Sequence, residues 1–165
     1  MLKLAVNVVV VVVGALLGSM GCGPKRVLPR EGSLINCREL DAKAAPTGAW
    51  HDGCALSIKG TKLTVKDYWQ CTIDGHFEDS AKGTAFVTDK GTCGRSTQVN
   101  KPEGDPCSGT VTAGRSIAFT KNANFDDEID VAGTIPFTIG AGAGCLLPKG
   151  EQRHLELKKE SLKVK

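Results

Sequence analysis

Residues 128–139, EIDVAGTIPFTI, decide the fold class of this chain. Ile129 and Val131 alternate with polar side chains, and the same alternation of apolar and polar residues returns over 134–139. Successive side chains of a β-strand point to opposite faces, so a period of two places the apolar residues on one face. The stretch therefore predicts β-strand with one buried face.

Similar short runs continue along the chain from Cys37 onward. The further runs with strand character are 55–58, 63–65, 68–73, 84–88, 109–112, 116–120, 155–157 and 162–164. The turn signals between them are Lys59-Gly60, Asp74-Gly75, Lys90-Gly91 and Ala113-Gly114. Short strands at regular spacing predict an all-β fold, either a single antiparallel β-sandwich or a small barrel. A short helix is expected only within 37–45.

The composition agrees with one domain rich in turns. The 165 residues include 20 glycines, and single domains usually span roughly 100–200 residues. Lys and Arg number 21 against 18 Asp and Glu, which gives a net charge of +3. This near balance differs from the strong basicity of a nucleic-acid binder, so we expect no nucleic-acid partner.

The six cysteines after Cys22 are spread through the domain. They are Cys37, Cys54, Cys71, Cys93, Cys107 and Cys145. Because zinc sites usually take two ligands from one tight turn and no CxxC is present, we predict no metal site. In an oxidising compartment six cysteines indicate three disulfides, whose pairing the spacing leaves open among fifteen connectivities.

The N-terminus has the layout of a signal sequence. Lys3 precedes an apolar stretch from Leu4 to Leu17, which is shorter than the roughly twenty residues needed to cross a bilayer as a helix. Small residues at 18, 19 and 21 then precede Cys22. Small residues at 19 and 21 also suit cleavage by an ordinary signal peptidase, so a soluble secreted form and an uncleaved anchor remain alternatives.

The boundary Gly21-Cys22 resembles the lipobox of bacterial lipoproteins. The resemblance covers the first 22 residues and implies cleavage before Cys22, a diacylglyceryl group on its sulfur and a further acyl chain such as palmitate on its amine. Lipidation of Cys22 removes the odd cysteine of the seven. Residue 23 is Gly and not Asp, which by the same resemblance favours the outer membrane of the cell envelope.

Three segments follow from these patterns. Residues 1–21 are the predicted signal peptide, 22–36 the lipidated tether and 37–165 the β domain. The tether contains Pro24 and Pro29 and shows neither the helical nor the strand period.

Catalytic patterns are weak. The histidines are His51, His76 and His154, and none belongs to a metal-binding or nucleophile motif. The glycine run 139–144 lacks the helix that a dinucleotide loop requires. Oxygen-bearing side chains alternate through 122–130, so calcium binding is left open beside an exposed acidic edge.

The leading expectation is a membrane-anchored envelope lipoprotein whose non-catalytic β domain binds a protein or cell-surface partner. One alternative is a lipoprotein that carries a small ligand inside a barrel. A less favoured alternative is an exported hydrolase built around His51 or His76. No cofactor is predicted.

Overall fold

The computed structural model describes residues 26–67, 69–95, 107–140 and 147–164. The predicted signal peptide, Cys22 and Cys145 lie outside these residues. The described residues form nine β-strands. They are β1 (Ser33–Leu40), β2 (His51–Lys59), β3 (Lys62–Lys66), β4 (Trp69–Ser80), β5 (Gly83–Arg95), β6 (Ser108–Val111), β7 (Gly114–Lys121), β8 (Glu128–Ile139) and β9 (Gln152–Lys163).

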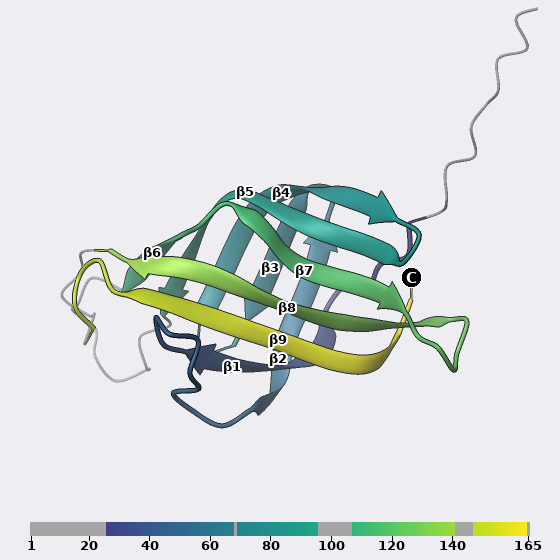
Figure 1. Ribbon diagram of the computed structural model, residues 1–165, viewed down its shortest axis with the longest axis horizontal. Helices are drawn as coiled ribbons and strands as arrows, with labels where there is room; N and C mark the ends of the chain where they lie inside the picture. Colours follow the sequence, from purple (N-terminus) through teal and green to yellow (C-terminus); the bar gives the residue numbers. More distant parts are fainter. Residues whose placement is uncertain (1–25, 68, 96–106, 141–146, 165) are drawn as a thin grey trace, which may run out of the picture.

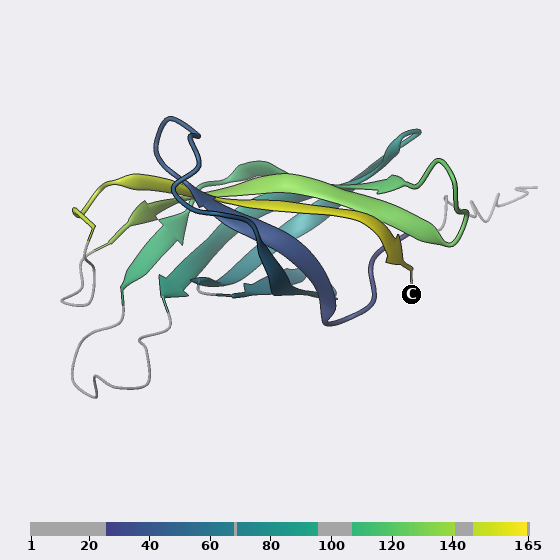
Figure 2. The ribbon, with the colours of Figure 1, turned by 90° about the horizontal axis from the view of Figure 1, so that it is seen from below.

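The strands close into an antiparallel barrel. Except for β6 and β7, each strand pairs with its neighbour in sequence, and β9 returns to pair with β1. The short strands β6 and β7 share one place between β5 and β8, so the closed ring has eight positions. Figure 1 shows β7, β8 and β9 in front of β2, β3 and β4, and Figure 2 shows the two layers crossing. Of the two predicted all-β architectures, the chain adopts the barrel.

The inward phase of every strand fills the barrel with apolar side chains. Phe86, Phe119 and Phe137 are each no more than 1% exposed, and isoleucines and leucines from the other strands pack around them. Burial of apolar area on this scale is the main force that holds a β-barrel together. The predicted run 128–139 forms β8 as one strand, with Ile129, Val131 and Phe137 inside.

Two predicted turn signals are wrong. Asp74-Gly75 and Lys90-Gly91 lie within β4 and β5, where Asp74 pairs with Lys90 and the register shifts at a β-bulge. A Cβ atom on Gly75 would lie 2.2 Å from the carbonyl oxygen of Val87. These glycines therefore permit close backbone approach at the bulge and do not reverse the chain. The helix expected in 37–45 is also absent, because β1 continues to Leu40.

Disulfides join neighbouring strands. Cys37–Cys54 links β1 to β2, and Cys71–Cys93 links a directly opposed pair on β4 and β5. Cys107 is disulfide-bonded as well. Each link closes a chain loop and stabilises the barrel mainly by restricting the unfolded state.

The barrel has two ends, which we call the tether end and the mouth. The tether end comprises residues 26–32, the turns at 60–61 and 81–82, the loop 122–127 and the last residues of β9. The mouth comprises the loop 41–50 and the ends of β1, β3, β5 and β8 together with the starts of β2, β4, β6 and β9. In Figure 1 the chain enters β1 and ends at the same side of the barrel.

Part of the predicted tether belongs to the barrel. Val27 and Leu28 pack against the core, and Pro29 forms a β-bridge with Val164. Arg30 Nε donates a hydrogen bond of 3.1 Å to the carbonyl oxygen of Val164. The first strand begins at Ser33, inside the stretch 22–36 that we expected to be tether.

Candidate functional site

The mouth carries a layer of polar side chains where the barrel interior would otherwise continue apolar. At the mouth ends of β1, β3, β4, β5 and β9, a buried apolar or cysteine side chain is followed, two positions closer to the mouth, by a charged residue or a tryptophan. Because the strand period is two, all five fall in the inward phase. We call this set the mouth layer; its members are Glu39, Asp67, Trp69, Arg95 and Arg153.

Three members of the mouth layer form one network. Trp69 Nε1 donates a hydrogen bond of 3.1 Å to Glu39 Oε2, and Arg153 forms an ion pair of 3.3 Å with Glu39 Oε1. Arg153 also pairs at 2.6 Å with Glu151. The Arg153 side chain is only 12% exposed, and its buried Nε has no hydrogen-bond partner among the described residues. The buried guanidinium thus pairs with two carboxylates, which offsets the cost of its burial.

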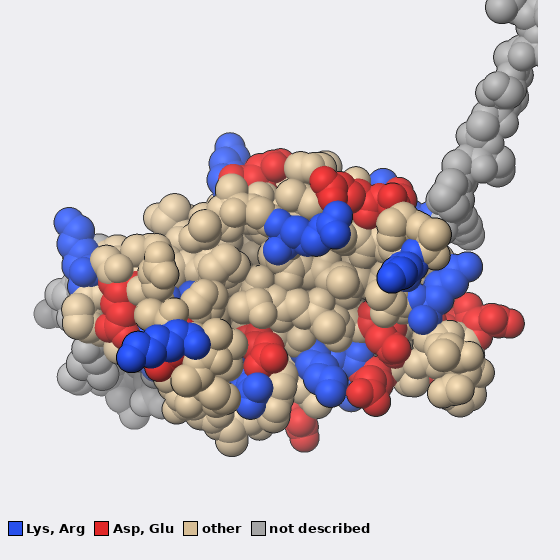
Figure 3. All heavy atoms as spheres, in the orientation of Figure 1, with Lys and Arg blue, Asp and Glu red and all other residues tan. Residues whose placement is uncertain are grey.

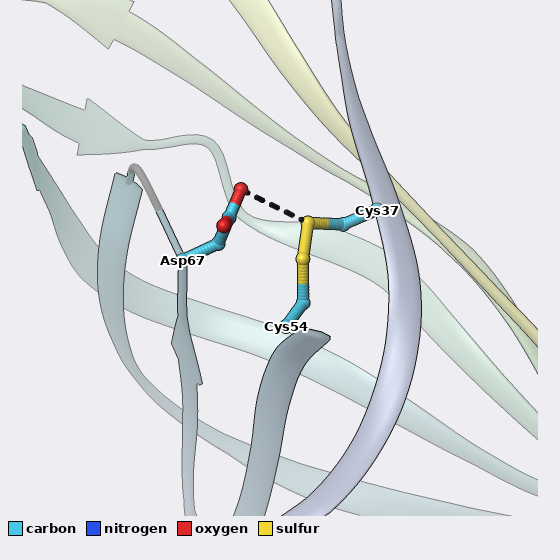
Figure 4. A group of neighbouring side chains, drawn as sticks. All are labelled: Cys37, Cys54 and Asp67. Carbon is cyan, nitrogen blue, oxygen red and sulfur yellow. Dashed lines mark hydrogen bonds between the residues drawn. A yellow bond between two sulfur atoms is a disulfide. The ribbon is translucent and has the colours of Figure 1, made fainter. Parts of the chain in front are cut away.

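Asp67 lies against the first disulfide. Its Oδ2 atom is 3.3 Å from Cys37 Sγ, and Figure 4 shows the carboxylate pointing at the Cys37–Cys54 bridge. Cys37, Cys54 and Asp67 place their ligand-type atoms within 4.8 Å of one another, and they are the group of this kind found among the described residues. Metal ions bind thiolates, which a disulfide does not offer, so in the oxidised protein the trio holds a disulfide and a carboxylate.

A hollow opens over the mouth layer. Its volume is about 480 Å³, and its floor is formed by Trp69 and Leu155. Arg95 covers the Trp69 ring with its guanidinium carbon 5.4 Å from the ring centroid. The polar side chains around this hollow are Arg38, Glu39, Thr47, His51, Asp67 and Arg95. Both donors and acceptors of hydrogen bonds therefore face the same space.

An exposed tryptophan stands beside the mouth. Trp50 is 37% exposed, and the Arg38 guanidinium lies 4.4 Å from the centroid of its ring. Arg38 is in turn ion-paired with Glu156 on β9. A second hollow of about 390 Å³ lies along the outer wall, bordered by Trp50, Asn36 and Lys158 among others. Arg38 thus borders the mouth hollow and packs against the indole ring that borders the second hollow.

The three histidines lie at different places in the barrel, and each has different neighbours. His51 borders the mouth hollow. His76 Nδ1 lies 3.0 Å from Asp89 on the exposed outer wall, and the Asp74 that neighbours it in sequence contacts Lys62 instead. His154 Nδ1 is 2.9 Å from the carbonyl oxygen of Asp41. The described residues thus give no histidine contact that includes both a carboxylate and a hydroxyl.

The acidic stretch 122–130 builds a hairpin end. Asp130 Oδ1 accepts hydrogen bonds from Asn122 Nδ2 at 2.8 Å and from the Ser161 backbone at 3.1 Å. Lys163 pairs with Asp127 and Glu128, which lowers the pKa of Asp127 and raises that of Lys163. These oxygens therefore make contacts within the protein, at the β8–β9 bulge and in the loop 122–127. Residues 141–146 of the glycine run fall outside the described residues.

The tether end contains a different hollow, of about 600 Å³, beside residues 26–27 and 79–84. Arg26 forms two hydrogen bonds to Asp79, and its guanidinium lies 4.7 Å from the centroid of the Phe77 ring. Arg26, followed by Thr84, holds the pKa of Asp79 below its ordinary value. These contacts fasten the chain to the barrel at its point of entry. Charges of both signs are mixed over the face seen in Figure 3.

Sequence reasoning missed the mouth layer, although its signal was present. Residues 35, 37 and 39 read Ile, Cys and Glu, and residues 153, 155 and 157 read Arg, Leu and Leu. A charged residue in the inward phase at a strand end is the pattern to look for. It becomes informative only when the topology shows that several such ends meet at one side of the barrel.

The part of the chain that the structure describes includes no helix long and apolar enough to cross a membrane. Neither a protein-family model, nor a curated protein, nor a solved structure matches this chain.

Proposed function

We propose that this chain is a lipid-anchored protein of the bacterial envelope, with the outer membrane favoured, whose non-catalytic barrel binds a protein or cell-surface partner at its mouth. The observation that carries the proposal is the placement of two features at opposite ends of the barrel. The chain enters and is fastened at the tether end, whereas the polar hollow opens at the mouth.

The length of the free tether sets the orientation. Three residues separate Cys22 from Arg26, so a lipid on Cys22 lies at most about 14 Å of chain from the barrel. Strands of 12 residues such as β9 extend about 40 Å. A barrel held this closely turns its tether end to the bilayer and its mouth away from it. The mouth is then the surface offered to partners.

The interior bears on the ligand-carrying alternative. The inward side chains of the described strands fill the barrel, so a small ligand would have to bind at the mouth and not in the centre. That alternative therefore uses the same surface as the leading proposal. The exposed His76–Asp89 pair gives the hydrolase alternative no enclosed site.

Metabolic labelling with an alkyne analogue of palmitate tests the anchor. We expect labelled wild-type protein in the membrane fraction and unlabelled, soluble Cys22→Ala protein. Label on Cys22→Ala, or wild-type protein without label, would contradict the lipid anchor.

Site-specific photo-cross-linking tests the binding surface. A photoreactive residue in place of Thr47 at the mouth is expected to capture a stoichiometric partner in intact cells, whereas one in place of Lys82 at the tether end is not. Capture from Lys82 alone, or equal capture from both ends, would overturn the assignment of the mouth.

A further inference from the structure

We infer that the mouth hollow and the groove beside Trp50 form one binding site for a neutral, linear oligosaccharide. This inference rests on the proposed binding role of the mouth and names the chemistry of its ligand. It draws on the charge balance of the two hollows, the exposed indole ring and the adjacency of the two hollows.

The charges around the mouth are paired. Glu39 is matched by Arg153, and Arg38 is matched by Glu156. Asp67 and Arg95 border the same hollow and carry opposite charges. Over the two hollows and the side chains linked to them by ion pairs, the described residues include five cations and five carboxylates: Arg38, Arg95, Arg153, Lys158 and Lys159 against Glu39, Asp67, Glu151, Glu156 and Glu160. A site with this balance suits a neutral ligand better than an anion or a cation.

The polar groups suit hydroxyls. Carboxylates only accept hydrogen bonds and guanidinium groups only donate them, and both kinds border one hollow. A sugar hydroxyl both donates and accepts, so it can bridge such pairs. The arginine stems and the Trp69 floor supply apolar surface beneath these polar tips, which matches the alternation of C–H and O–H groups on a pyranose ring.

Trp50 provides a fixed aromatic surface. Its ring is held by Arg38, which is itself held by Glu156, so little conformational freedom remains to be lost when a ligand packs against it. Because Trp50 is 37% exposed, part of its large amphipathic ring is open to a ligand. The C–H face of a sugar ring is a flat apolar surface of suitable size.

The two hollows are adjacent around one short segment. Trp50 borders the wall hollow, its neighbour His51 borders the mouth hollow, and Arg38, which also borders the mouth hollow, packs against the Trp50 ring. Their volumes of about 390 and 480 Å³ each fall within the roughly 300–1,000 Å³ range of small-molecule sites. A ligand that occupies both must be extended, which indicates several linked sugar units.

A peptide fits these features less well. Peptides often add a strand to a free sheet edge, but the strands at the mouth are paired into a closed ring. A helical peptide needs an apolar groove, whereas the side chains around the mouth are mostly polar. The observations therefore favour the saccharide.

The chain offers a natural probe of this site. Its two tryptophans, Trp50 and Trp69, both lie at the mouth, so intrinsic fluorescence reports on this region alone. The mature lipidated protein is titrated in a zwitterionic detergent without a sugar head group. The neutral probes are maltotriose, cellotriose, tri-N-acetylchitotriose and mannotriose, with trigalacturonic acid as an acidic comparison.

We expect a saturable change in emission with at least one neutral trisaccharide, altered less than twofold between 0.05 and 0.5 M NaCl. Trp50→Ala is expected to weaken binding at least tenfold, Asp67→Asn about fivefold, and Trp50→Phe less than Trp50→Ala. Lys82→Ala, at the opposite end, serves as the matched control with unchanged affinity. Circular dichroism confirms that each variant is folded.

Three results would overturn the inference: no neutral trisaccharide binds, only the acidic one binds and salt abolishes it, or Trp50→Ala binds as tightly as the wild type. Partner capture from position 47 would survive any of these results if the mouth binds a protein. Loss of that capture as well would remove the proposed function itself.

Discussion

The two ends of the barrel are built by different means. At the tether end, strands are joined by short turns such as 60–61 and 81–82, and exposed ion pairs such as Arg26–Asp79 fasten the chain. At the mouth, the loop 41–50 is longer, two disulfides tie neighbouring strands, and charged side chains point inward. The difference is the basis of the proposal that the tether end attaches the domain and the mouth contacts a ligand or partner.

The covalent and polar devices at the mouth have a physical reason. Charged side chains that face into the barrel at the mouth are costly to bury. They therefore stabilise this end less than apolar side chains in the same positions would. The disulfides Cys37–Cys54 and Cys71–Cys93 lie one layer below them and restrict the strands there. The mouth thus keeps a polar surface without losing its shape.

The largest expected effects on the free energy of unfolding come from removing a large core side chain at either end of the barrel. Phe119→Ala near the tether end and Trp69→Ala at the mouth each remove a side chain that is 1% exposed. Each is expected to lower the free energy of unfolding by about 3–5 kcal/mol, measured by urea denaturation. A cost below about 1 kcal/mol for Trp69→Ala alone would show that the mouth layer is not part of the core.

Removal of one disulfide is expected to cause the next largest loss of stability. The double variant Cys71→Ala/Cys93→Ala opens a loop with a sequence separation of 22, and Cys37→Ala/Cys54→Ala opens one of 17. Each should cost about 3 kcal/mol by loss of restriction on the unfolded chain. Thermal unfolding with and without a thiol reductant provides the measurement. An unchanged unfolding midpoint in both variants would contradict a role for these bonds in holding the mouth.

The ion pair at the mouth is tested by a double-mutant cycle. Arg153→Met leaves Glu39 buried without its cation and is expected to cost about 2 kcal/mol. The pair Glu39→Met/Arg153→Met replaces both charges with apolar side chains and should cost less than the single change. If the double variant is less stable than Arg153→Met, the ion pair itself stabilises the fold, and its polar character is not retained only for the surface of the mouth.

The smallest expected effect lies at the tether end and depends on pH. Arg26 and Asp79 are a third or more exposed, so Arg26→Ala should change global stability by less than about 1 kcal/mol. The pKa of Asp79 is lowered in the folded protein, so its contribution is present above the ordinary carboxyl pKa and is lost as the pH falls through the lowered value. The protection of residues 26–32 from hydrogen exchange, relative to the intrinsic exchange rate at each pH, should therefore fall in acid before the barrel unfolds. Equal protection of wild type and Arg26→Ala would mean that the packing of Val27 and Leu28 holds the segment by itself.

Strand periodicity made most of the barrel predictable. The runs at 55–58, 63–65, 84–88 and 116–120 all lie within strands, because apolar alternation follows directly from one buried face. The whole of β1 was missed, and a short helix was expected over 37–45, because Ser33 and Asn36 surround only one buried apolar residue, Ile35. Gly75 and Gly91 were misleading because glycine serves turns and close strand approach equally.

The candidate site was less predictable than the fold. Glu39, Asp67 and Arg153 are ordinary charged residues in sequence, and their meaning depends on which strand ends share a side of the barrel. Choosing between a sandwich and a closed ring also needed the pairing of β9 with β1, a contact between residues more than a hundred positions apart. Local patterns do not encode such contacts.

The pairing of the first and last strands has a consequence for how the chain is made. β1 leaves the ribosome before the other strands, yet its ladder with β9 can form only after the last strand has been made. Until then β1 exposes an unpaired edge, the kind of edge that promotes aggregation. The disulfides Cys37–Cys54 and Cys71–Cys93 each join residues close in sequence, so they can form before the barrel is complete. They then reduce the number of misfolded states open to the incomplete barrel.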